Sequence, residues 1–368
     1  MPDLHDIGWT RALAEEFARL TAASPAAPPA GALVPARVAE QQKTLYRVWS
    51  AEGELEAKVS GKLRHRAERP EDLPAVGDWV AASVRAAEGA ATIETLLPRA
   101  SALVRKRAGE EVTAQVLAAN VDVVFLVTSL DRDFSLRRLE RALAMVWECG
   151  ASPVILLNKA DACPDPKSYV EDVGAAALGV PTHVLSALTG QGIDALAPHL
   201  GRGKTAVLLG SSGVGKSTIA NRLLGSEAFE VAAVRESDQR GRHTTTHREL
   251  VRLPGGGLLI DTPGLREIQL WDSAEGMQET FADVEEIAAS CRFSDCRHES
   301  EPGCAVVAAV ESGALDSGRV ASWRKLQREL AHLARKQDAR VEAQERRKWK
   351  SVSQEMRRRR GPDGQFRR

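Results

Sequence analysis

Hydrophobic and polar positions alternate in short runs between Leu33 and Pro98. Turn-forming segments, among them AEG and RPEDLP, separate the five runs, which read LVPARVAEQ, TLYRVWS, ELEAKVS, GDWVAASVR and ATIETLLP. A period of two is typical of strands with one buried face. Five short strands without long helices predict a small β-barrel, for which the OB-fold is the candidate arrangement.

Beyond about residue 100 the pattern changes to continuous apolar runs, at residues 121–130, 153–158, 205–210 and 257–261. Such runs are typical of strands that are buried on both faces of a parallel sheet. Helical periodicity lies between them, as in LRRLERALAMVWECG. The alternation of strands and helices predicts a doubly wound α/β domain.

Both ends of the chain show helical patterns. Residues 9–20 predict a short amphipathic helix, and the Ala- and Pro-rich residues 21–32 predict a linker. After about Asp272 the chain is mostly helical, with an apolar stripe spaced by three and four at Val320, Trp323, Leu326, Leu330 and Leu333.

Charge is balanced overall and unevenly distributed. The chain carries 50 basic and 50 acidic residues, but residues 319–368 hold 17 Lys plus Arg against 6 Asp plus Glu. This basic C-terminal stretch favours contacts with phosphates. The sequence shows neither a signal-peptide pattern nor a membrane-length apolar run, so we expect a cytoplasmic protein without a membrane partner.

A complete phosphate-loop motif, G-x-x-x-x-G-K-[ST], lies between a predicted strand and a predicted helix. Its backbone N–H groups would face phosphate oxygens, Lys216 would reach the β- and γ-phosphates, and the Ser217 hydroxyl would bind Mg²⁺. The alternative, a Gly-rich turn with a chance lysine, is disfavoured by the flanking strand and helix. The candidate residues are Gly210, Ser211, Ser212, Gly213, Val214, Gly215, Lys216, Ser217 and Thr218.

Two later segments complete this phosphate site. DTPG, at Asp261–Gly264, ends a buried run, so Asp261 would hold Mg²⁺ and the Gly264 N–H would sense the γ-phosphate. Between it and the phosphate loop lies RGRHTTT, at residues 240–246, where a threonine would complete the Mg²⁺ shell. We favour Thr245, with Thr244 second; a plain surface loop is the alternative.

NKAD, at residues 158–161, is a candidate guanine-reading segment. The Asp161 carboxylate would accept from guanine N1–H and the 2-amino group, a donor pair that adenine lacks. Asn158 would brace the loop, and the Lys159 stem would lie over the purine. NKAD alone could be a capped turn, but Ser186 and Ala187 follow the next short apolar run, where a backbone N–H for guanine O6 is expected.

These elements stand in an unusual order: both base segments precede the phosphate loop, the threonine loop and DTPG. This is a cyclic permutation of the usual GTPase order. The site would survive it because all these loops gather at the carboxyl ends of parallel strands.

A C-x4-C-x-H-x5-C pattern follows, offering three thiolates and one imidazole at Cys291, Cys296, His298 and Cys304. This set suits a closed tetrahedral Zn²⁺ site with a structural role. Free cysteines near a surface histidine are the alternative. Cys149 and Cys163 look like ordinary small residues.

Taken together, the chain resembles the ribosome small-subunit-dependent GTPase A family of circularly permuted GTPases, over about residues 33–335. The resemblance rests on VGDWV at 76–80, NKAD, GSSGVGKS, GRHTTT, DTPG and CRFSDCRHESEPGC. It implies an N-terminal OB-fold, a central GTPase and a C-terminal zinc domain. It also implies late maturation of the small (30S) ribosomal subunit, with 16S rRNA as partner and GTP hydrolysis stimulated by the subunit.

We therefore expect a multidomain monomer that uses GTP with Mg²⁺ and holds one Zn²⁺. The expected boundaries are an N-terminal helix and linker (1–32), an OB-fold (33–100), a circularly permuted GTPase (101–275), a helical zinc-binding domain (276–350) and a basic tail (351–368).

The barrel segment has few aromatic residues, Tyr46, Trp49 and Trp79, so a base-stacking platform is not evident. A strip of cations could contact phosphates, with a solvated face as the equal alternative for each member. The strip comprises Lys58, Lys62, Arg64, His65 and Arg66.

Catalysis is predicted to depend on Lys216, Thr245 and a group that holds the attacking water. In Ras-like GTPases a glutamine after the DxxG glycine does this, but Leu265 stands there. His243 is the candidate within the chain, and an rRNA or ribosomal group is the alternative. An RNA-binding assembly scaffold, in which nucleotide only sets domain orientation, is the competing function; Asp161 argues against an ATP-using enzyme.

Overall fold

The computed structural model describes residues 3–22, 33–42, 44–107, 113–131, 134–226, 248–261, 280–293, 296–299 and 301–328. The chain divides into two compact units. Unit 1 is Met1–Gln269 with Glu275–Thr280, and unit 2 is Leu270–Ala274 with Phe281–Arg368.

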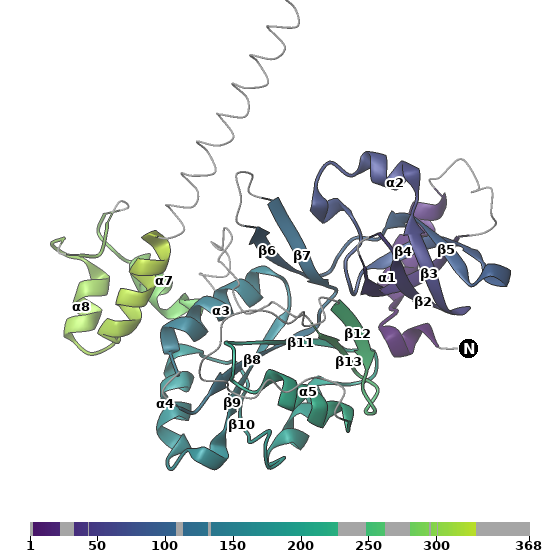
Figure 1. Ribbon diagram of the computed structural model, residues 1–368. Coiled ribbons are helices and arrows are strands. Elements are labelled where there is room, and N and C mark those ends of the chain that lie inside the picture. The colour runs from purple at the N-terminus through teal and green to yellow at the C-terminus, as the bar shows by residue number, and fades with distance from the viewer. Residues whose placement is uncertain are drawn as a thin grey trace, which may run out of the picture. The chain divides into compact units, whose positions relative to one another are not determined.

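Unit 1 contains the expected five-stranded barrel (Figure 1). Its strands are β1 (Leu33–Gln41), β2 (Tyr46–Ser50), β3 (Gly53–Val59), β4 (Trp79–Arg85) and β5 (Ala90–Leu96), with the short helix α2 (Gly61–Arg66) after β3. The order β1-β2-β3-β5-β4 closes through the β1–β4 pairing, and β3 with β5 is the parallel pair. Alternate small and branched residues such as Val38, Val48 and Ile93 fill the interior, which confirms an OB-like barrel.

The α/β part of unit 1 is a sheet of order β10-β9-β8-β11-β13-β12. The strands are β8 (Val123–Ser129), β9 (Ser152–Asn158), β10 (Thr182–Val184), β11 (Thr205–Leu209), β12 (Arg248–Arg252) and β13 (Leu258–Asp261). All adjacent pairs are parallel except β12 with β13. The continuous apolar runs therefore form the central strands, as predicted.

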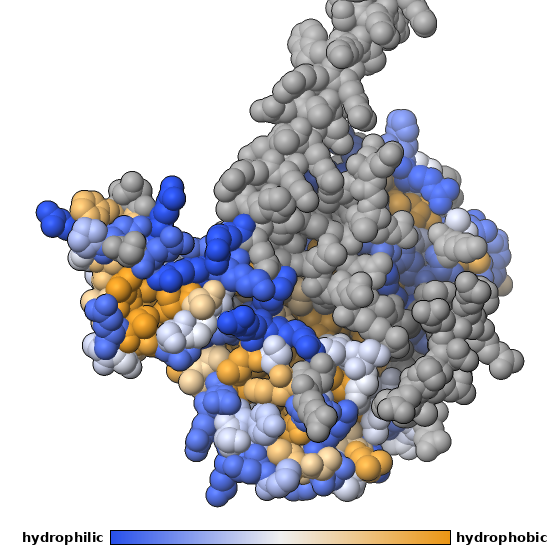
Figure 2. Space-filling view, turned by 60° about the vertical axis from the view of Figure 1, so that its left-hand side comes forward, coloured by the Kyte–Doolittle hydropathy of each residue, from blue (hydrophilic) through white to orange (hydrophobic). Residues whose placement is uncertain are grey.

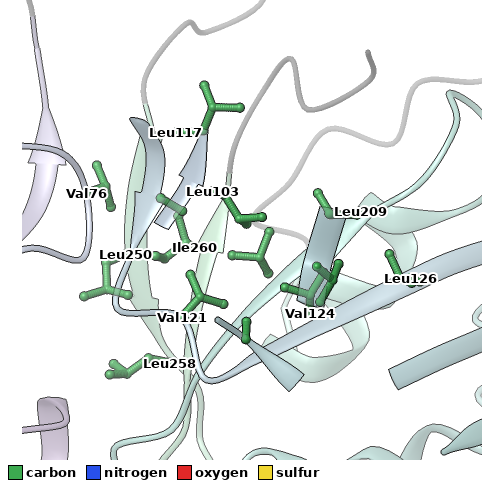
Figure 3. Close-up of a cluster of buried hydrophobic side chains, with 14 of the residues drawn as sticks. Val76, Leu103, Leu117, Val121, Val124, Leu126, Leu209, Leu250, Leu258 and Ile260 are labelled. Carbon is green, nitrogen blue, oxygen red and sulfur yellow. The ribbon is translucent and has the colours of Figure 1, made fainter. Parts of the chain in front are cut away.

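Helices cover both faces of this sheet. Val124 and Leu126 of β8 pack in one cluster with α3 (Leu136–Glu148) and α4 (Pro166–Ala176). Phe125 and Val127, the alternate residues, pack in another cluster with α5 (Lys216–Leu224) and the 3-10 helix η5 (Ile193–His199). Figure 3 shows part of the first cluster. The two clusters on opposite faces together confirm the doubly wound architecture.

The barrel and the α/β sheet are joined by backbone hydrogen bonds. Strand β1 pairs antiparallel with β12, with Glu40 opposite Glu249 and Gln41 opposite Arg248, so that one sheet of 11 strands runs through unit 1. A separate hairpin, β6 (Ala102–Arg107) with β7 (Thr113–Ala119), follows the barrel in the chain and was not predicted.

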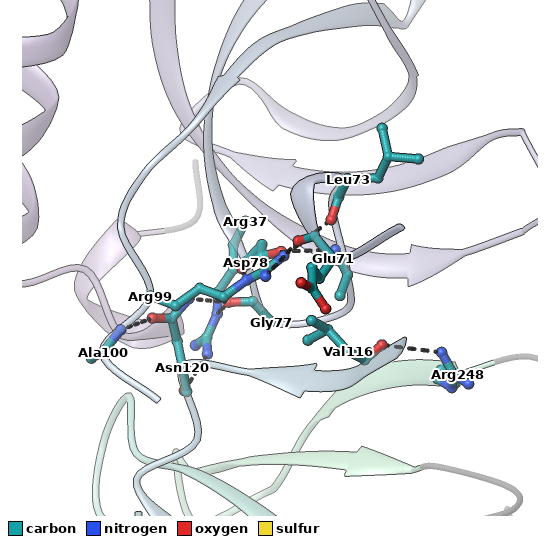
Figure 4. A network of polar contacts seen from close by, with 11 residues as sticks. Arg37, Glu71, Leu73, Gly77, Asp78, Arg99, Ala100, Val116, Asn120 and Arg248 are labelled. Carbon is teal, nitrogen blue, oxygen red and sulfur yellow. Dashed lines mark hydrogen bonds and ion pairs between the residues drawn. The ribbon is translucent and has the colours of Figure 1, made fainter. Parts of the chain in front are cut away.

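A buried polar network holds the same junction (Figure 4). Arg37, 1% exposed on β1, donates to the carbonyls of Ile7 (2.5 Å), Gly77 (3.2 Å) and Asn120 (3.1 Å) and to Thr205 Oγ1 (2.8 Å). Burial lowers the pKa of its guanidinium to about 10, with Asp122 and Asp78 opposing the shift, so the group stays charged at neutral pH.

Asp78 of the VGDWV turn lies beside this network. Burial raises the pKa of its carboxyl, and hydrogen bonds from Arg99 oppose the shift. Arg99 donates to both Asp78 oxygens, from Nε at 2.8 Å and Nη2 at 2.7 Å. At Gly77, φ is +92° and a Cβ would lie 2.1 Å from the Ala119 carbonyl oxygen, so only glycine fits this turn.

The N-terminal segment adds the 3-10 helix η1 (Leu4–Ile7) and α1 (Arg11–Ala22), close to the helix expected at 9–20. Trp9 and Phe17 pack against the main core, and the Trp9 ring lies 4.7 Å from that of Trp79. The Ile7 carbonyl bonded by Arg37 belongs to η1, which ties this segment to the junction.

Unit 2 is helical, with α7 (Ala282–Ala288), α8 (Ala305–Glu311) and a helix over residues 317–328. Val320, Trp323 and Leu326 of the predicted stripe are buried, whereas Leu330 and Leu333 lie outside the described residues. Arg319 forms a two-bond ion pair with Asp283, at 2.8 and 2.7 Å.

On the face shown in Figure 2, hydrophobic residues form separate patches divided by hydrophilic ones. Within the described ranges, none of the helices has the length and apolar character needed to cross a bilayer. The expected domain boundaries stay predictions.

Replacing Arg37 with Met should destabilise unit 1. The carbonyls of Ile7 and Asn120 and the Thr205 hydroxyl would lose their Arg37 donor in a buried place, and this loss costs about 3 kcal/mol or more. The Gly77 carbonyl would keep only its bond from the Asn120 side chain. We expect a lower urea midpoint by tryptophan fluorescence. The control is Arg85→Met, whose exposed side chain pairs with Glu88 and should shift stability by less than about 0.5 kcal/mol. Equal midpoints for the two variants would contradict a structural role of the network.

Candidate functional site

The carboxyl ends of β8, β9, β10, β11 and β13 lie at one edge of the sheet, because these strands run parallel. The base segments follow β9 and β10, the phosphate loop follows β11, and Asp261 ends β13 (Figure 1). The permuted chain order therefore leaves the two base segments, the phosphate loop and Asp261 at a common edge.

The phosphate loop connects β11 to α5, as predicted. Gly213 and Gly215 have φ of +81° and +98°, conformations that favour glycine. A Cβ at Gly210 would lie 2.2 Å from the Val127 carbonyl oxygen, and one at Gly215 would lie 2.3 Å from Asn158 Nδ2. These glycines thus let the loop pass close to β8 and to the base segment.

Lys216 begins α5 and its ammonium reaches back over the loop. Nζ donates to the carbonyl oxygens of Gly210 (2.8 Å) and Ser211 (2.6 Å). These contacts hold the positive charge beside the loop's backbone, at the N-terminus of α5, where anions are favoured. Ser217 and Thr218 follow in the first turn and are half-buried.

Asn158 connects three loops. Its side chain is 2% exposed; Nδ2 donates to the Val214 carbonyl at 2.7 Å and Oδ1 accepts from the Ala187 N–H at 2.9 Å. The amide therefore links the NKAD segment to the phosphate loop and to the Ser186–Ala187 segment. This is the bracing geometry that the sequence predicted.

The neighbouring residues complete the base side. Asp161 is exposed, and its Oδ1 accepts a hydrogen bond from the Ser186 hydroxyl. Lys159 has a left-handed backbone, φ +68°, and its Nζ lies 2.9 Å from Asp131 Oδ2. Asp131 also accepts from Ser129 Oγ at 2.7 Å, so it positions the lysine predicted to lie over the purine.

Sequence analysis did not predict three contacts at this edge. They are the Asp131 pair, the hydrogen bond from Arg138 of α3 to Ser211 Oγ (2.6 Å), and the bonds from Arg222 of α5 to the carbonyls of Ala187 (3.0 Å) and Leu188 (2.5 Å). Each joins residues distant in the chain, and no local pattern marks such partners.

Several predicted residues fall outside what the structure describes. For Asp261 only the backbone is described, opposite Glu249 in the β12–β13 pair. His243, Thr244, Thr245 and Gly264 lie outside the described residues.

The structure brings together the four predicted metal ligands of unit 2. One ligand atom from each of Cys291, Cys296, His298 and Cys304 lies within 4.8 Å of the others. Cys291 Sγ is 3.4 Å from His298 Nδ1 and 3.9 Å from Cys304 Sγ, and Cys304 Sγ is 3.6 Å from that nitrogen. In a tetrahedral zinc site, bond lengths of about 2.3 Å to sulfur and about 2.0 Å to nitrogen separate two sulfurs by about 3.8 Å and a sulfur from the nitrogen by about 3.5 Å.

The surroundings of the cluster support this fit. Cys304 precedes α8 and accepts from the Val307 N–H at 3.5 Å, a bond suited to a thiolate. The His298 ring lies 5.1 Å from the ring of Trp323, whose Nε1 donates to Glu285 at 2.7 Å. Cys149 is different: burial raises the pKa of its thiol to about 11, as in an ordinary core cysteine.

Comparison with known proteins identifies the family. The sequence model described as RsgA GTPase matches residues 96–271, and the one described as 50S ribosome-binding GTPase matches residues 205–341. A protein of Oceanobacillus iheyensis named small ribosomal subunit biogenesis GTPase RsgA 1 is 45% identical over 326 residues, which cover 88% of this chain and 93% of that protein. The chain belongs to the RsgA GTPase family.

Other relatives agree with this RsgA assignment. The small ribosomal subunit biogenesis GTPase RsgA of Opitutus terrae is 49% identical over 342 residues, 90% of this chain and 93% of that protein. The crystal structure of YjeQ from Thermotoga maritima matches with a TM-score of 0.63 and 28% identity, over 81% of this chain and 99% of that one. YloQ, described as a circularly permuted GTPase, matches with a TM-score of 0.60 and 23% identity, over 83% and 98%, and shows the shared fold.

Replacing Asp161 with Asn should move this protein from guanine towards xanthine nucleotides, because an amide donor suits the 2-oxo group. The loss of two bonds to a carboxylate, each worth about 1.5–3 kcal/mol, should weaken GTP binding by about 100-fold or more. Competition binding measures the change, with Asp172→Asn, an exposed aspartate of α4, as the control. Equal affinity of the parent protein for ATP and GTP would refute the base-site assignment.

Purified protein should contain one zinc per chain. Cys296→Ser should lose the metal and helical signal, since ligand binding and folding are coupled in such sites. Metal analysis and circular dichroism provide the measurements, and Cys163→Ser, outside the cluster, is the control. Substoichiometric metal in the parent, with an unchanged helical signal in Cys296→Ser, would exclude a structural site.

Proposed function

We propose that this chain hydrolyses GTP in the biogenesis of the small ribosomal subunit and that the subunit stimulates the reaction. Its relatives are named small ribosomal subunit biogenesis GTPases. The observation that carries the proposal is the amide of Asn158, bonded to the phosphate loop and to the second base segment. This contact supports one guanine-nucleotide site assembled from loops in permuted order.

In this proposal the loop from Gly210 to Thr218 holds the phosphates through its N–H groups, with Lys216 on the β- and γ-phosphates. Asp161 reads the guanine base, Lys159 covers its face, and the Ala187 N–H region receives O6. Ser217, Asp261 and Thr245 hold Mg²⁺, which offsets phosphate charge when bound. Gly264 detects the γ-phosphate.

The family and the charge distribution support a proposal about partners. We infer that the protein works in the cytoplasm as a monomer on the 30S subunit, contacts 16S rRNA and has no membrane partner. Cys291, Cys296, His298 and Cys304 hold one structural Zn²⁺ that stabilises unit 2. The basic residues 319–368, including the tail at 351–368, add phosphate contacts.

The isolated chain should turn over slowly. Leu265 stands where Ras-like GTPases have the glutamine that orients water, and its side chain has no donor or acceptor. We propose that docking on the subunit brings His243, of the segment 240–246, to the attacking water. An imidazole can hydrogen-bond water near neutral pH.

Turnover with and without purified small subunits tests this proposal. We expect strong stimulation of the parent, and loss of most of it in His243→Ala with GTP affinity and subunit binding retained. His247→Ala is the control from the same part of the sequence. If the subunit stimulates GTP hydrolysis by His243→Ala as strongly as that by the parent, His243 does not position the attacking water. A parent that binds GTP and subunits but is not stimulated would favour the scaffold function.

A further inference from the structure

Arg138 lies on the phosphate side of the sheet edge that carries the nucleotide segments. It belongs to the first turn of α3 and donates from Nη1 to Ser211 Oγ at 2.6 Å. Ser211 is the second residue of the phosphate loop, and its carbonyl oxygen accepts from Lys216 Nζ at 2.6 Å. Two cations from different helices therefore meet at one residue of the loop.

The start of α3 is held firmly against the sheet. Leu139 and Leu143 are buried and pack in the same cluster as Leu126 of β8, the strand that precedes α3 in the chain. The backbone N–H groups of Arg138 and Leu139 both donate to the Ser135 carbonyl at 3.1 Å. The exposed Arg138 side chain therefore extends from a fixed backbone towards the phosphate loop.

Other cations at this edge serve the base segments. Lys159 pairs with Asp131 at 2.9 Å, and Arg222 of α5 donates to the carbonyls of Ala187 and Leu188. Their charges are committed to the side of the site that reads guanine. The guanidinium on α3 differs from them, because its bond leads to the loop predicted to hold the phosphates.

The position of Lys216 indicates which phosphates would lie near Arg138. In phosphate-loop GTPases the loop lysine contacts the β- and γ-phosphates. Its ammonium is bonded here to the carbonyls of Gly210 and Ser211, so these phosphates belong at the Ser211 end of the loop. A guanidinium has five N–H donors, and the bond to Ser211 Oγ uses one of them. An ionised phosphate oxygen is a stronger acceptor than a neutral hydroxyl.

Hydrolysis of GTP shifts negative charge within this region. A water oxygen bonds to the γ-phosphorus, and the bond from that phosphorus to the β–γ bridging oxygen breaks with its electron pair staying on the oxygen. One water hydrogen remains on the phosphate product and the other leaves as a proton, so the products are GDP, hydrogen phosphate and a proton. An arginine beside the γ-phosphate stabilises the charge that spreads over its oxygens in the transition state.

We propose that Arg138 is a catalytic residue of the GTPase site and that its guanidinium donates to the γ-phosphate oxygens in the transition state. The inference rests on the proposed function, because it assigns a residue to the hydrolysis of GTP. The role differs from that of His243, which would hold the attacking water. The bond to Ser211 keeps the arginine beside the loop in a position to act.

Single-turnover hydrolysis of GTP by the full chain, with Mg²⁺ and purified small subunits, tests the proposal. Arg138→Ala should lower the rate by about 100-fold or more, with little change in KM. Arg138→Lys should recover part of the rate, because an ammonium keeps the charge and loses the planar fork of donors. Affinity for GDP should stay within about threefold of the parent's, since GDP lacks the γ-phosphate.

Aluminium fluoride supplies a readout that a purely structural role would not change. Together with GDP it occupies the γ-phosphate position and mimics the transition state, and such mimics bind more tightly than the ground state. The parent on the small subunit should therefore hold GDP more tightly when aluminium fluoride is added. Arg138→Ala should lose most of this gain while its affinity for GDP alone is retained.

The controls separate the guanidinium from its bond to the loop. Ser211→Ala removes the acceptor and keeps the arginine, so the rate should fall by about tenfold at most, which is the value of one neutral hydrogen bond. Arg137→Ala removes the same charge from the neighbouring exposed position of α3 and should match the parent. If Arg138→Ala also lowers the thermal midpoint, Arg138→Gln, which keeps donors without charge, should show the same loss of rate.

Four results would overturn the assignment of Arg138. The first is a parent-like rate in Arg138→Ala, and the second is an equal loss in Arg137→Ala, which would show an effect of net charge. The third is an equal loss in Ser211→Ala with the aluminium fluoride gain retained, which would show that the arginine only braces the loop. The fourth is a loss of GDP affinity as large as the loss of rate. A parent that binds GTP and does not hydrolyse it, with or without subunits, would instead refute the proposed function.

Discussion

The buried amide of Asn158 is the contact on which the nucleotide site depends. An amide taken out of water must satisfy its donor and its acceptor, and here both partners are backbone groups of other loops, Val214 and Ala187. Gly215 must remain without a Cβ because the same amide occupies that space. The distances between the loops at this edge are therefore set by hydrogen-bond lengths, whatever the order in which the loops occur along the chain.

A second buried group gives the barrel a fixed relation to the α/β sheet within unit 1. A charged guanidinium in the interior is costly unless its donors are satisfied, and Arg37 satisfies them on η1, the VGDWV turn, Asn120 and β11. Together with the β1–β12 pairing, this network makes the barrel an extension of the sheet. Strand β12, which pairs with β1 of the barrel, is followed in the chain by β13, and β13 ends at Asp261.

The features predicted correctly from the sequence are those that a short stretch of residues determines. Alternation revealed the barrel strands, continuous apolar runs revealed β8, β9, β11 and β13, and the spacing of cysteines revealed the cluster in unit 2. The β6–β7 hairpin was not predicted, because charged residues in VRKRAGEEVTAQV interrupt the alternation of apolar and polar positions. The burial of Arg37 was not predicted for a related reason. A charged residue in an alternating strand normally faces water, and only the tertiary fold supplies its buried acceptors.

The strand order has a consequence for the way the chain is synthesised. The barrel closes on itself through β1 and β4, so it can finish folding before the rest emerges. Strands β8, β9 and β10 come next, but β11, which pairs with the free edge of β8, is made about 80 residues after β8. During that interval the nascent sheet exposes an unpaired edge, the kind of edge on which chains aggregate or chaperones act. The β1–β12 joint forms later still, so the barrel attaches to the sheet only near the end of translation of unit 1.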